Sequence, residues 1–512
     1  MKSIDIKKIP HINEITAQHG SFAGTPAKPK ETFNERMSAK NKVVPSLAEA
    51  IRLTGLRDGM TISFHHHFRN GDYVVNMVVD EIAKMGIKNL TLAASSLTDI
   101  HAPLIEHIRN GVITHIETSG LRGKLAEEVS RGLMDFPIVF RSHGGRAAAI
   151  ESGELHIDVA FLGAPSCDPY GNANGYNRDE ENATCCGSLG YAKLDALHAD
   201  KCVIITDHIV RFPNTPYGIP ESNVDYVVKV DSIGDPKGIM SGATRFTKNP
   251  KELLIAKTAA EVIEASGYFY DGFSMQMGSG GASLATARFL RQKMLDRGIH
   301  CRFALGGITG QITAMHEEGL IDRILDVQSF DLDAAKSLKN NHFHHQIGAT
   351  YYASYLVDSA VDQLDFVVLS ALEIDTDFNV NVLTGSDGVI RGAIGGHPDT
   401  AEGASLSVVV APLTRGRIPT IVKHVNTVVT PGDAVDVVVT DQGIAVNPRR
   451  PDVKEKLEKA GLHVFTIEQL QQRAEKIVGM PEPIRYKDRV VGVVMYRDNT
   501  IIDVIRQIDE DA

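Results

Sequence analysis

Two glycine-rich stretches of the chain combine residue types that bind anions. The first (278–281, GSGG) separates an expected strand from an expected helix, and the second lies in DGVIRGAIGGHPDT (387–400) with an arginine and a histidine. Backbone N–H groups at a helix start can hold a phosphate, a carboxylate or an oxyanion, and arginine pairs with carboxylates and phosphates. A tight turn or a bulge explains the glycines equally well. The candidates are Gly278, Gly280, Gly281, Gly395, Gly396, Arg391 and His397.

A run of three histidines, His65, His66 and His67, stands at the end of another expected strand and is followed closely by Arg69. Side chains at a strand end point in alternating directions, so three adjacent rings do not easily reach one metal ion. The run therefore favours anion recognition, with packed or solvated imidazoles as the structural alternative. A second cluster, with His342, His344 and His345 in NHFHHQ (341–346), could serve either metal binding or anion recognition. No metal ligand set is predicted.

The elements that position these loops occur twice along the chain. A strand at Thr61–Phe64, a loop, a helix and a strand at Asn89–Ala94 have counterparts at Ser274–Met277 and beyond. Ile157–Asn174 matches Leu364–Asn381 at a constant offset of 207 residues, and Val224–Val228 matches Val435–Val439. Similar composition of unrelated strands is the weaker explanation. The order and spacing predict two similarly folded halves.

Short Val/Ile-rich runs alternate with helical patterns in both halves, which predicts two open, mostly parallel α/β domains with a cleft between them. We expect an N-terminal arm (1–45), a first domain (46–245) and a second domain (246–512). The second domain would end in two helices, at Val453–Ala460 and Ile467–Ile477. A hairpin of Val490–Tyr496 and Ile501–Ile505 would follow them.

Composition excludes several classes of protein. The 512 residues carry a net charge of −11, which argues against nucleic acid or an anionic membrane as the main partner. No apolar run approaches the ~18 residues that a membrane span needs. Five cysteines and a polar, lysine-bearing N-terminus favour reduced thiols and a cytoplasmic location. There is no GxSxG elbow, Walker loop or zinc ribbon.

Several longer strings resemble a known family. They are LRDGMTISFHHHFRNG, GAPSCDPYGNANG, QMGSGGASLATARFL, RFALGGITGQITAMHEEGLID, LSALEIDTDFNVNV and GAIGGHPDTAEGASLSVVVAPL. The chain resembles the CoA-transferase superfamily and, within it, the alpha subunits of citrate lyase. The resemblance extends over nearly the whole chain and implies two related α/β domains, in agreement with the internal repeat.

The resemblance also implies an activity and partners. Such a subunit exchanges acetyl for citryl on an acyl-carrier thioester and releases acetate. A separate beta subunit then cleaves the citryl thioester. The CoA-like phosphopantetheine prosthetic group belongs to the carrier (gamma) subunit, so no cofactor is expected on this chain. A divalent ion accompanying citrate stays open, and an oligomer is expected.

Many superfamily members use a glutamate on the strand after the second-half glycine loop as a nucleophile. In this chain the corresponding stretch, Gly298–Gly310, has none, and Arg302 stands in that neighbourhood. We therefore expect a citrate carboxylate to attack the acetyl thioester directly and form a mixed anhydride, with the two glycine loops stabilising the oxyanion. Glu373 is the rival nucleophile, although a structural role is favoured; its counterpart in the repeat is Ser166.

Citrate has three carboxylates, which need several cations or hydrogen-bond donors. The expected ligands are His65, His66, His67, Arg69, Arg302, Arg391 and His397. In a net-negative chain, these groups should gather in the cleft against the overall charge. Two alternatives remain at this point: transfer to another acid, such as malonate or a short-chain acid with CoA, and a non-catalytic scaffold for the carrier and lyase subunits.

Overall fold

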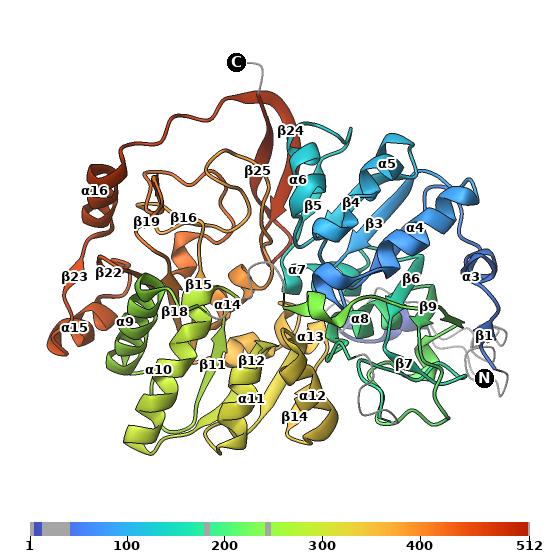
Figure 1. Cartoon of the computed structure of the whole chain (residues 1–512), viewed down its shortest axis with the longest axis horizontal. Helices are drawn as coiled ribbons and strands as arrows, with labels where there is room; N and C mark the ends of the chain where they lie inside the picture. Colours follow the sequence, from blue (N-terminus) through green and yellow to red (C-terminus); the bar gives the residue numbers. More distant parts are fainter. Residues whose placement is uncertain (1–4, 13–40, 179–184, 241–246, 510–512) are drawn as a thin grey trace. The chain divides into compact units, whose positions relative to one another are not determined.

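Two open sheets, one for each half of the chain, form the framework of the structure (Figure 1). The computed structural model describes residues 5–12, 41–178, 185–240 and 247–509. The chain divides into two compact units, residues 1–39 and 40–512. In the first unit, the described residues include one short 3-10 helix, η1 (Ile6–Lys8). Most of the predicted arm lies outside the described residues, and its last residues form an edge strand of the first sheet, β1 (Val43–Val44).

The first sheet has ten strands in the order β1-β10-β9-β6-β2-β3-β4-β5-β24-β25. All neighbours are parallel except the last pair. After β1, the strands are β2 (Thr61–Phe64), β3 (Leu90–Ala94), β4 (Ile113–Thr118), β5 (Ile138–Phe140), β6 (Val159–Gly163), β9 (Lys201–Thr206), β10 (Tyr226–Lys229), β24 (Tyr486–Met495) and β25 (Ile501–Ile508).

The second sheet has nine strands in the order β14-β13-β12-β11-β15-β18-β21-β22-β23. Its neighbours are parallel except β21 and β22. The strands are β11 (Phe273–Met277), β12 (Cys301–Ile308), β13 (Ile324–Ser329), β14 (His344–Gln346), β15 (Phe366–Ser370), β18 (Leu406–Val410), β21 (Val437–Thr440), β22 (Gly443–Val446) and β23 (Val464–Phe465). The mostly parallel α/β class is therefore confirmed.

The internal repeat is confirmed strand by strand. In each sheet the first strand after the opening helix, β2 or β11, lies in the middle. It has β6-β9-β10 or β15-β18-β21 on one side and β3-β4-β5 or β12-β13-β14 on the other. Even the small hairpin that follows β6 or β15 recurs at the predicted offset of 207 residues. These hairpins are β7 (Ser166–Cys167) with β8 (Ala173–Asn174), and β16 (Glu373–Ile374) with β17 (Val380–Asn381). A further two-stranded ribbon joins β19 (Thr414–Arg415) to β20 (Ile418–Pro419).

Helices cover the faces of the sheets. In the first half they are α3 (Leu47–Thr54), η2 (Arg69–Gly71), α4 (Val74–Lys84), η3 (Asp99–His101), α5 (Leu104–Arg109), α6 (Gly123–Ser130), α7 (His143–Ser152), α8 (Gly190–His198), η4 (Glu221–Asn223) and η5 (Pro236–Ile239). In the second half they are α9 (Pro250–Ser266), α10 (Gly281–Arg297), α11 (Gly310–Glu317), α12 (Leu332–Asn340), α13 (Ala349–Ala353), η6 (Ala360–Gln363), α14 (His397–Gly403), η7 (Gly432–Ala434), α15 (Pro451–Lys459) and α16 (Ile467–Val478).

Both faces of the second sheet are buried. Val408 and Val410 of β18 belong to a core with α9 and α10, whereas Val409 belongs to a second core with α16. Alternate residues of a strand point to opposite faces, so a sheet covered on both sides needs an unbroken apolar run. This requirement explains the three consecutive valines of β18, in which every residue is buried. The one polar residue of the strand, Ser407, donates its hydroxyl to the carbonyl of Ala434 at 2.7 Å.

One prediction about domain organisation is wrong in the structure. The sequence predicts that the terminal hairpin, β24–β25, belongs to the second domain. Instead, β24 pairs with β5 of the first sheet, with Gly492 opposite Ile138 and Val494 opposite Phe140. The open edge of β5 offers unpaired backbone groups, and the hairpin satisfies them. The domain boundaries near residues 45 and 245 stay a prediction. In the described residues, no helix has the length and apolarity needed to span a membrane.

Candidate functional site

A cavity of about 560 Å³ lies between the two halves. Its walls include the carboxyl ends of strands and the loops that follow them, from β2, β3, β4 and β5 in the first sheet and from β11, β12, β13, β15 and β18 in the second. Ligands of open α/β sheets bind at this end of the strands. The predicted cleft is therefore present, and both halves contribute to it.

The walls are held together by hydrogen bonds between the halves. Ile394 N–H donates to the carbonyl of Ser119 at 2.8 Å, and Leu121 N–H donates to that of Gly392 at 3.0 Å. These contacts tie the second glycine stretch to the loop after β4. This part of the cavity wall is therefore formed by loops from both halves, which are hydrogen-bonded to each other.

The histidine run is divided by the structure. His66 lines the cavity, whereas the described cavity lining includes neither His65 nor His67. The His65 ring donates through Nε2 to the carbonyl of Gly163 at 2.9 Å. His67 lies 3.5 Å from the buried carboxylate of Asp72. Alternation of side chains at the strand end sends neighbours in different directions, as the sequence indicated. The structure therefore places His65 and His67 outside the described cavity lining, with their rings packed inside the first half.

His66 is held in one neutral form. Its Nε2–H donates to Oε1 of Gln328 at 2.8 Å, so Nδ1 accepts from the hydroxyl of Ser95 at 2.5 Å. Burial, together with nearby cationic groups, lowers the pKa of His66 well below its usual value. His66 can present the face and edge of a neutral ring to a ligand but carries no positive charge there.

Positive charge in the cavity comes from arginines. The described lining contains four, Arg69, Arg122, Arg391 and Arg415, against one carboxylate, Glu252. This composition agrees with the expected gathering of cations in a net-negative chain. Burial lowers the pKa of Arg69 to about 10, which still leaves it protonated at neutral pH. Arg391 is half-exposed and forms an ion pair with Asp387.

Arg122 was not among the predicted ligands. It precedes α6 in the loop after β4. Its backbone N–H donates to the carbonyl of Leu97 at 3.2 Å, but its guanidinium has no hydrogen bond or ion pair with any described residue, although the nearby carboxylate of Asp99 acts on its pKa. Burial lowers the pKa of Arg122 from its usual value. A half-buried guanidinium that faces a cavity without a carboxylate partner is suited to bind an anionic ligand. The available sequence signal was its position directly after a first-sheet strand.

Arg302, by contrast, lies at the end of its strand that is remote from the cavity. It is the second residue of β12, and the cavity is lined from the other end of that strand, at Gly307. Its guanidinium donates to the carbonyl of Gln363 at 2.8 Å and pairs with Asp365 at 3.3 Å. The structure therefore places Arg302 away from the cavity that the other candidate residues line, and its role as a citrate ligand is not supported by its position. The internal repeat does not show how far along β12 a residue must lie to reach the cavity, so the sequence could not place Arg302 at the start of the strand.

The first glycine loop lines the cavity at the start of α10. Gly278 uses its own N–H in the sheet, where it donates to the carbonyl of Val368 at 2.7 Å, so it offers no donor to a ligand. The N–H groups of Ser279, Gly280 and Gly281 have no partner among the described residues. Gly280 is the N-cap of α10, and a free helix N-terminus attracts negative charge. Gly280 and Gly281 thus have N–H groups available to a ligand, whereas the N–H of Gly278 is engaged; their predicted role in the reaction stays a prediction.

The second glycine stretch lines the same cavity, as predicted. Gly395 has a φ of +57°, a conformation that favours glycine, and Gly396 is the N-cap of α14. Neither N–H has a partner among the described residues. His397 follows, but its ring is fully engaged: Nε2–H donates to the carbonyl of Ser370 at 3.1 Å and Nδ1 accepts from Thr430 at 2.7 Å. His397 supports the loop and has no free nitrogen for a ligand.

Glu373 is saturated by hydrogen bonds. Its carboxylate accepts from Asn381 Nδ2 at 2.9 Å and from both the backbone and the side chain of Asn426, each at 3.0 Å. It is buried and is not among the residues that line the cavity. In the first half, Ser166 accepts from Asn214 in the same way. The repeat thus preserves a loop-bracing contact at this position, which favours the structural role of Glu373.

A family model described as citrate lyase, alpha subunit (CitF), matches residues 40–508. The chain belongs to the citrate lyase alpha subunit family. The predicted family is therefore confirmed, and with it a transferase subunit of the citrate lyase complex.

Similar citrate lyase alpha chains span nearly the full length. That of Escherichia coli (strain K12) is 59% identical over 483 residues, which cover 94% of each chain. That of Haemophilus influenzae is 56% identical over 497 residues, covering 97% of this chain and 99% of the relative. A solved structure described as the alpha subunit of citrate lyase in complex with citrate, from Streptococcus mutans, has 55% identity and a TM-score of 0.89. It covers 98% of this chain and 99% of that one.

A more distant structure, the alpha subunit of a malonate decarboxylase from Acinetobacter baumannii, matches with a TM-score of 0.63 at 14% identity. It covers 88% of this chain and 95% of that chain. At this identity the likeness concerns the fold alone. It extends the CoA-transferase-like architecture beyond citrate lyase alpha subunits.

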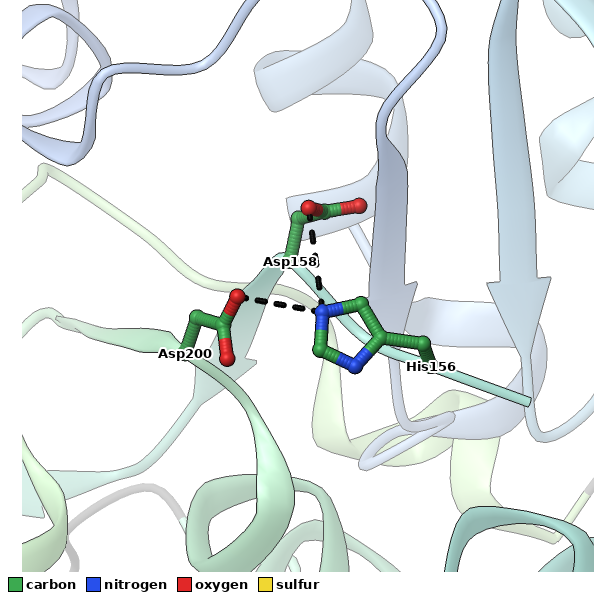
Figure 2. Close-up of side chains that lie close together, drawn as sticks. All are labelled: His156, Asp158 and Asp200. Atoms are coloured by element: carbon green, nitrogen blue, oxygen red, sulfur yellow. Dashed lines mark hydrogen bonds and ion pairs between the residues drawn. The ribbon is translucent and has the colours of Figure 1, made fainter. Parts of the chain in front are cut away.

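One group of side chains among the described residues has the spacing of metal ligands. Figure 2 shows His156 with Asp158 and Asp200. The His156 Nε2 atom lies 3.0 Å from Asp200 and 3.9 Å from Asp158. His156 and Asp200 are exposed, and the group lies where β6 and β9 begin, at the sheet edge opposite the cavity. The other cluster, NHFHHQ, has His344 paired with the buried Asp326 at 3.0 Å.

We expect His397 to make the stability of this citrate lyase alpha subunit depend on pH. Burial lowers its pKa to about 4, against about 6.5 in an unfolded chain. The unfolded chain therefore binds a proton between these values and the folded one does not, so stability present above pH 6.5 is lost as the pH falls toward 4. His397→Asn should reduce the loss between pH 6 and pH 5 by about 1 kcal/mol, measured from urea unfolding.

The same substitution at the exposed His463 controls for the effect of asparagine itself. An unchanged difference between pH 6 and pH 5 in His397→Asn would show that His397 is not kept neutral by the fold.

Proposed function

We propose that this chain transfers an acyl-carrier thioester from acetate to citrate and releases acetate, by direct attack of a citrate carboxylate. The observation that carries the proposal is the composition of the cavity: unpartnered backbone N–H donors from two glycine loops stand beside arginines. The described lining contains a single carboxylate, Glu252. Such a site is suited to position two acids and stabilise an oxyanion, and less suited to covalent catalysis by a side chain.

The first-half wall supplies the ligands for citrate. Arg69 and Arg122 are the cations, and Ser96, Thr98 and Ser119 add hydroxyl groups in the same lining. Three carboxylates on one small molecule need more than one cation, and arginine can bind each of them through two parallel hydrogen bonds. His66 keeps the base of this wall in place through Gln328 of the second half.

The reaction needs no net proton transfer. A citrate carboxylate oxygen forms a bond to the acetyl carbonyl carbon, and the resulting tetrahedral oxyanion collapses as the carbon–sulfur bond breaks. This gives a mixed acetic-citric anhydride and a thiolate on the carrier. The thiolate then attacks the citryl carbonyl, a new carbon–sulfur bond forms, and acetate leaves. Each tetrahedral step places negative charge on oxygen, where N–H donors lower the barrier.

The partners in this proposal are the carrier subunit, which bears the phosphopantetheine-like prosthetic group, and the lyase beta subunit that cleaves the citryl thioester. We expect the thioester to enter beside the glycine loop at α10, where the free N–H groups of the helix start can hold a phosphate or carboxylate. None of the five cysteines forms a disulfide, in keeping with a reducing, cytoplasmic location.

The exchange reaction tests the proposal. The purified chain is mixed with acetyl-carrier and citrate, and acetate release is measured, with malonate and succinate as alternative acceptors. Acetate release with citrate alone is expected. Binding of the carrier without any exchange would instead support a scaffold, and release with malonate or succinate but not citrate would support another acid.

The covalent route is tested in the same mixture. The chain is treated with hydroxylamine after reaction with acetyl-carrier and analysed by mass spectrometry. Direct attack predicts no hydroxamate on the chain. A hydroxamate on Glu252 or Glu373 would show a glutamyl intermediate and overturn the anhydride mechanism.

A further inference from the structure

His143 is a cavity-lining residue that the proposed mechanism has not yet used. It is the first residue of α7, directly after the N-cap Ser142. Its ring packs against Tyr191 with centroids 4.5 Å apart, and the Tyr191 ring stacks on that of His66, with centroids 5.8 Å apart. Packing against an aromatic neighbour restricts the ring to one orientation.

The two ring nitrogens have different surroundings. Nδ1 is shut off from solvent and has no hydrogen-bond partner among the described residues. Nε2 lies 3.7 Å from the position that a Cβ atom on Gly395 would occupy. Since the ring lines the cavity and Nδ1 faces protein, Nε2 is the nitrogen that a ligand would meet.

The ring is neutral, and the position of its single proton follows from these surroundings. Burial and the nearby Arg146 lower the pKa of His143 to about 3, and its place at a helix start also disfavours positive charge. A proton on Nδ1 would leave a buried N–H without an acceptor, which costs more than a buried lone pair. The proton therefore belongs on Nε2, where it points toward the cavity.

His143 and the second glycine stretch are fixed to each other. The backbone N–H of His143 donates to the carbonyl of Gly395 at 2.9 Å. The buried carboxylate of Asp399 accepts from Ser142 Oγ at 2.7 Å and from Gly144 N–H at 2.9 Å. Asp399 lies in α14, which starts directly after Gly396. One carboxylate thus joins the residues on both sides of His143 to the helix that follows the glycines.

We propose that His143 is a catalytic hydrogen-bond donor whose Nε2–H completes an oxyanion hole with the N–H groups of Gly395 and Gly396. This inference rests on the proposed transferase function and adds one residue to it. The donor binds the carbonyl oxygen of the thioester, and its hydrogen bond strengthens as negative charge develops on that oxygen when citrate attacks. The proton stays on Nε2 throughout the reaction, because a neutral imidazole can polarise a carbonyl group through a hydrogen bond without giving up its own proton.

Three substitutions separate this role from a structural one. His143→Ala removes the donor, His143→Gln offers an amide N–H at about the reach of Nε2, and His143→Asn offers one at the reach of Nδ1. Acetate release from acetyl-carrier and citrate is measured for each, with circular dichroism as the test of folding. We expect His143→Ala and His143→Asn to lose about 10²-fold in kcat. The KM for citrate should stay within threefold of wild type, and His143→Gln should recover at least tenfold over His143→Ala.

The pH profile adds a second readout. A donor that stays neutral contributes no ionisation between pH 5.5 and 8, so the limbs of the kcat profile should coincide in wild type and His143→Gln. Loss of a limb in His143→Gln would identify a general base and overturn the inference. Equal activity of all three variants would overturn it too. If the wild-type chain itself released no acetate, the proposed function would fail first, before the role of His143 came into question.

Discussion

Gly396→Ala is expected to lower kcat/KM for acetate release by on the order of 10³-fold, because it displaces the backbone donors of the second glycine stretch. Gly396 has a φ of −94°, which alanine also adopts, so the cost is steric. A Cβ there would lie 2.4 Å from the hydroxyl oxygen of Tyr352. The Tyr352 ring is buried and its hydroxyl accepts from Gln276 Nε2 at 3.0 Å, so the loop must move and not the ring.

A second substitution gives this prediction an internal control. Tyr352→Phe removes the clashing oxygen and, alone, costs about 1 kcal/mol for one buried hydrogen bond. In Gly396→Ala/Tyr352→Phe, the nearest remaining ring atom is 3.3 Å from the new Cβ, so we expect activity to recover at least tenfold over Gly396→Ala. Additive losses in the double variant, or near-normal activity of Gly396→Ala, would remove the Gly395–Gly396 N–H groups from the reaction.

Arg122→Gln is expected to raise the KM for citrate by roughly 10²- to 10³-fold, since it removes a charge-assisted contact to a carboxylate. Glutamine keeps much of the length and a donor, so the variant isolates the charge. Because Arg122 forms no ion pair within the described residues, its loss leaves no carboxylate of the protein unpaired, and the folded state should keep its stability. Steady-state kinetics with citrate as the varied substrate measures the effect.

Arg302→Gln is the matched control. It makes the same chemical change on a residue that pairs with Asp365 at the opposite end of β12, and it should leave the KM for citrate unchanged. A similar rise in KM for both variants would mean that general charge, and not position in the cavity, governs citrate affinity. An unchanged KM in Arg122→Gln would exclude Arg122 from the citrate site.

The fold was predictable because the sequence contains the same information twice. The hairpin after β6 and the one after β15 share an Asp and two Asn at the same spacing. In both copies the Asp carboxylate accepts from the turn's own backbone, as Asp168 does from Gly171 and Asp375 does from Asn379. Because both hairpins need these local hydrogen bonds, the same residue types recur in both halves, and the repeat can be recognised from a single sequence. The pairing of β24 with β5 leaves none, because strand edges are alike in composition.

The site was predictable where backbone geometry decides it and not where side-chain direction does. Glycines between a strand and a helix mark free N–H groups, and both stretches line one cavity. Side chains alternate in direction at a strand end, and the sequence does not show which of His65, His66 and His67 points toward that cavity. Arg122 and His143 could not be predicted, because neither belongs to a motif or spacing typical of a catalytic or binding site. They come together only because the carboxyl ends of β4 and β5 meet at the same cavity.

The place of the last hairpin has a consequence for synthesis on the ribosome. The second sheet is built entirely from residues 273–465, so all of its strands are available before residue 486 is added. The first sheet, begun at Val43, acquires its two outermost strands only when residue 508 has emerged. The sheet of the second half can therefore be complete before the sheet of the first half, and β5 keeps an open edge until the residues of β24 have been translated.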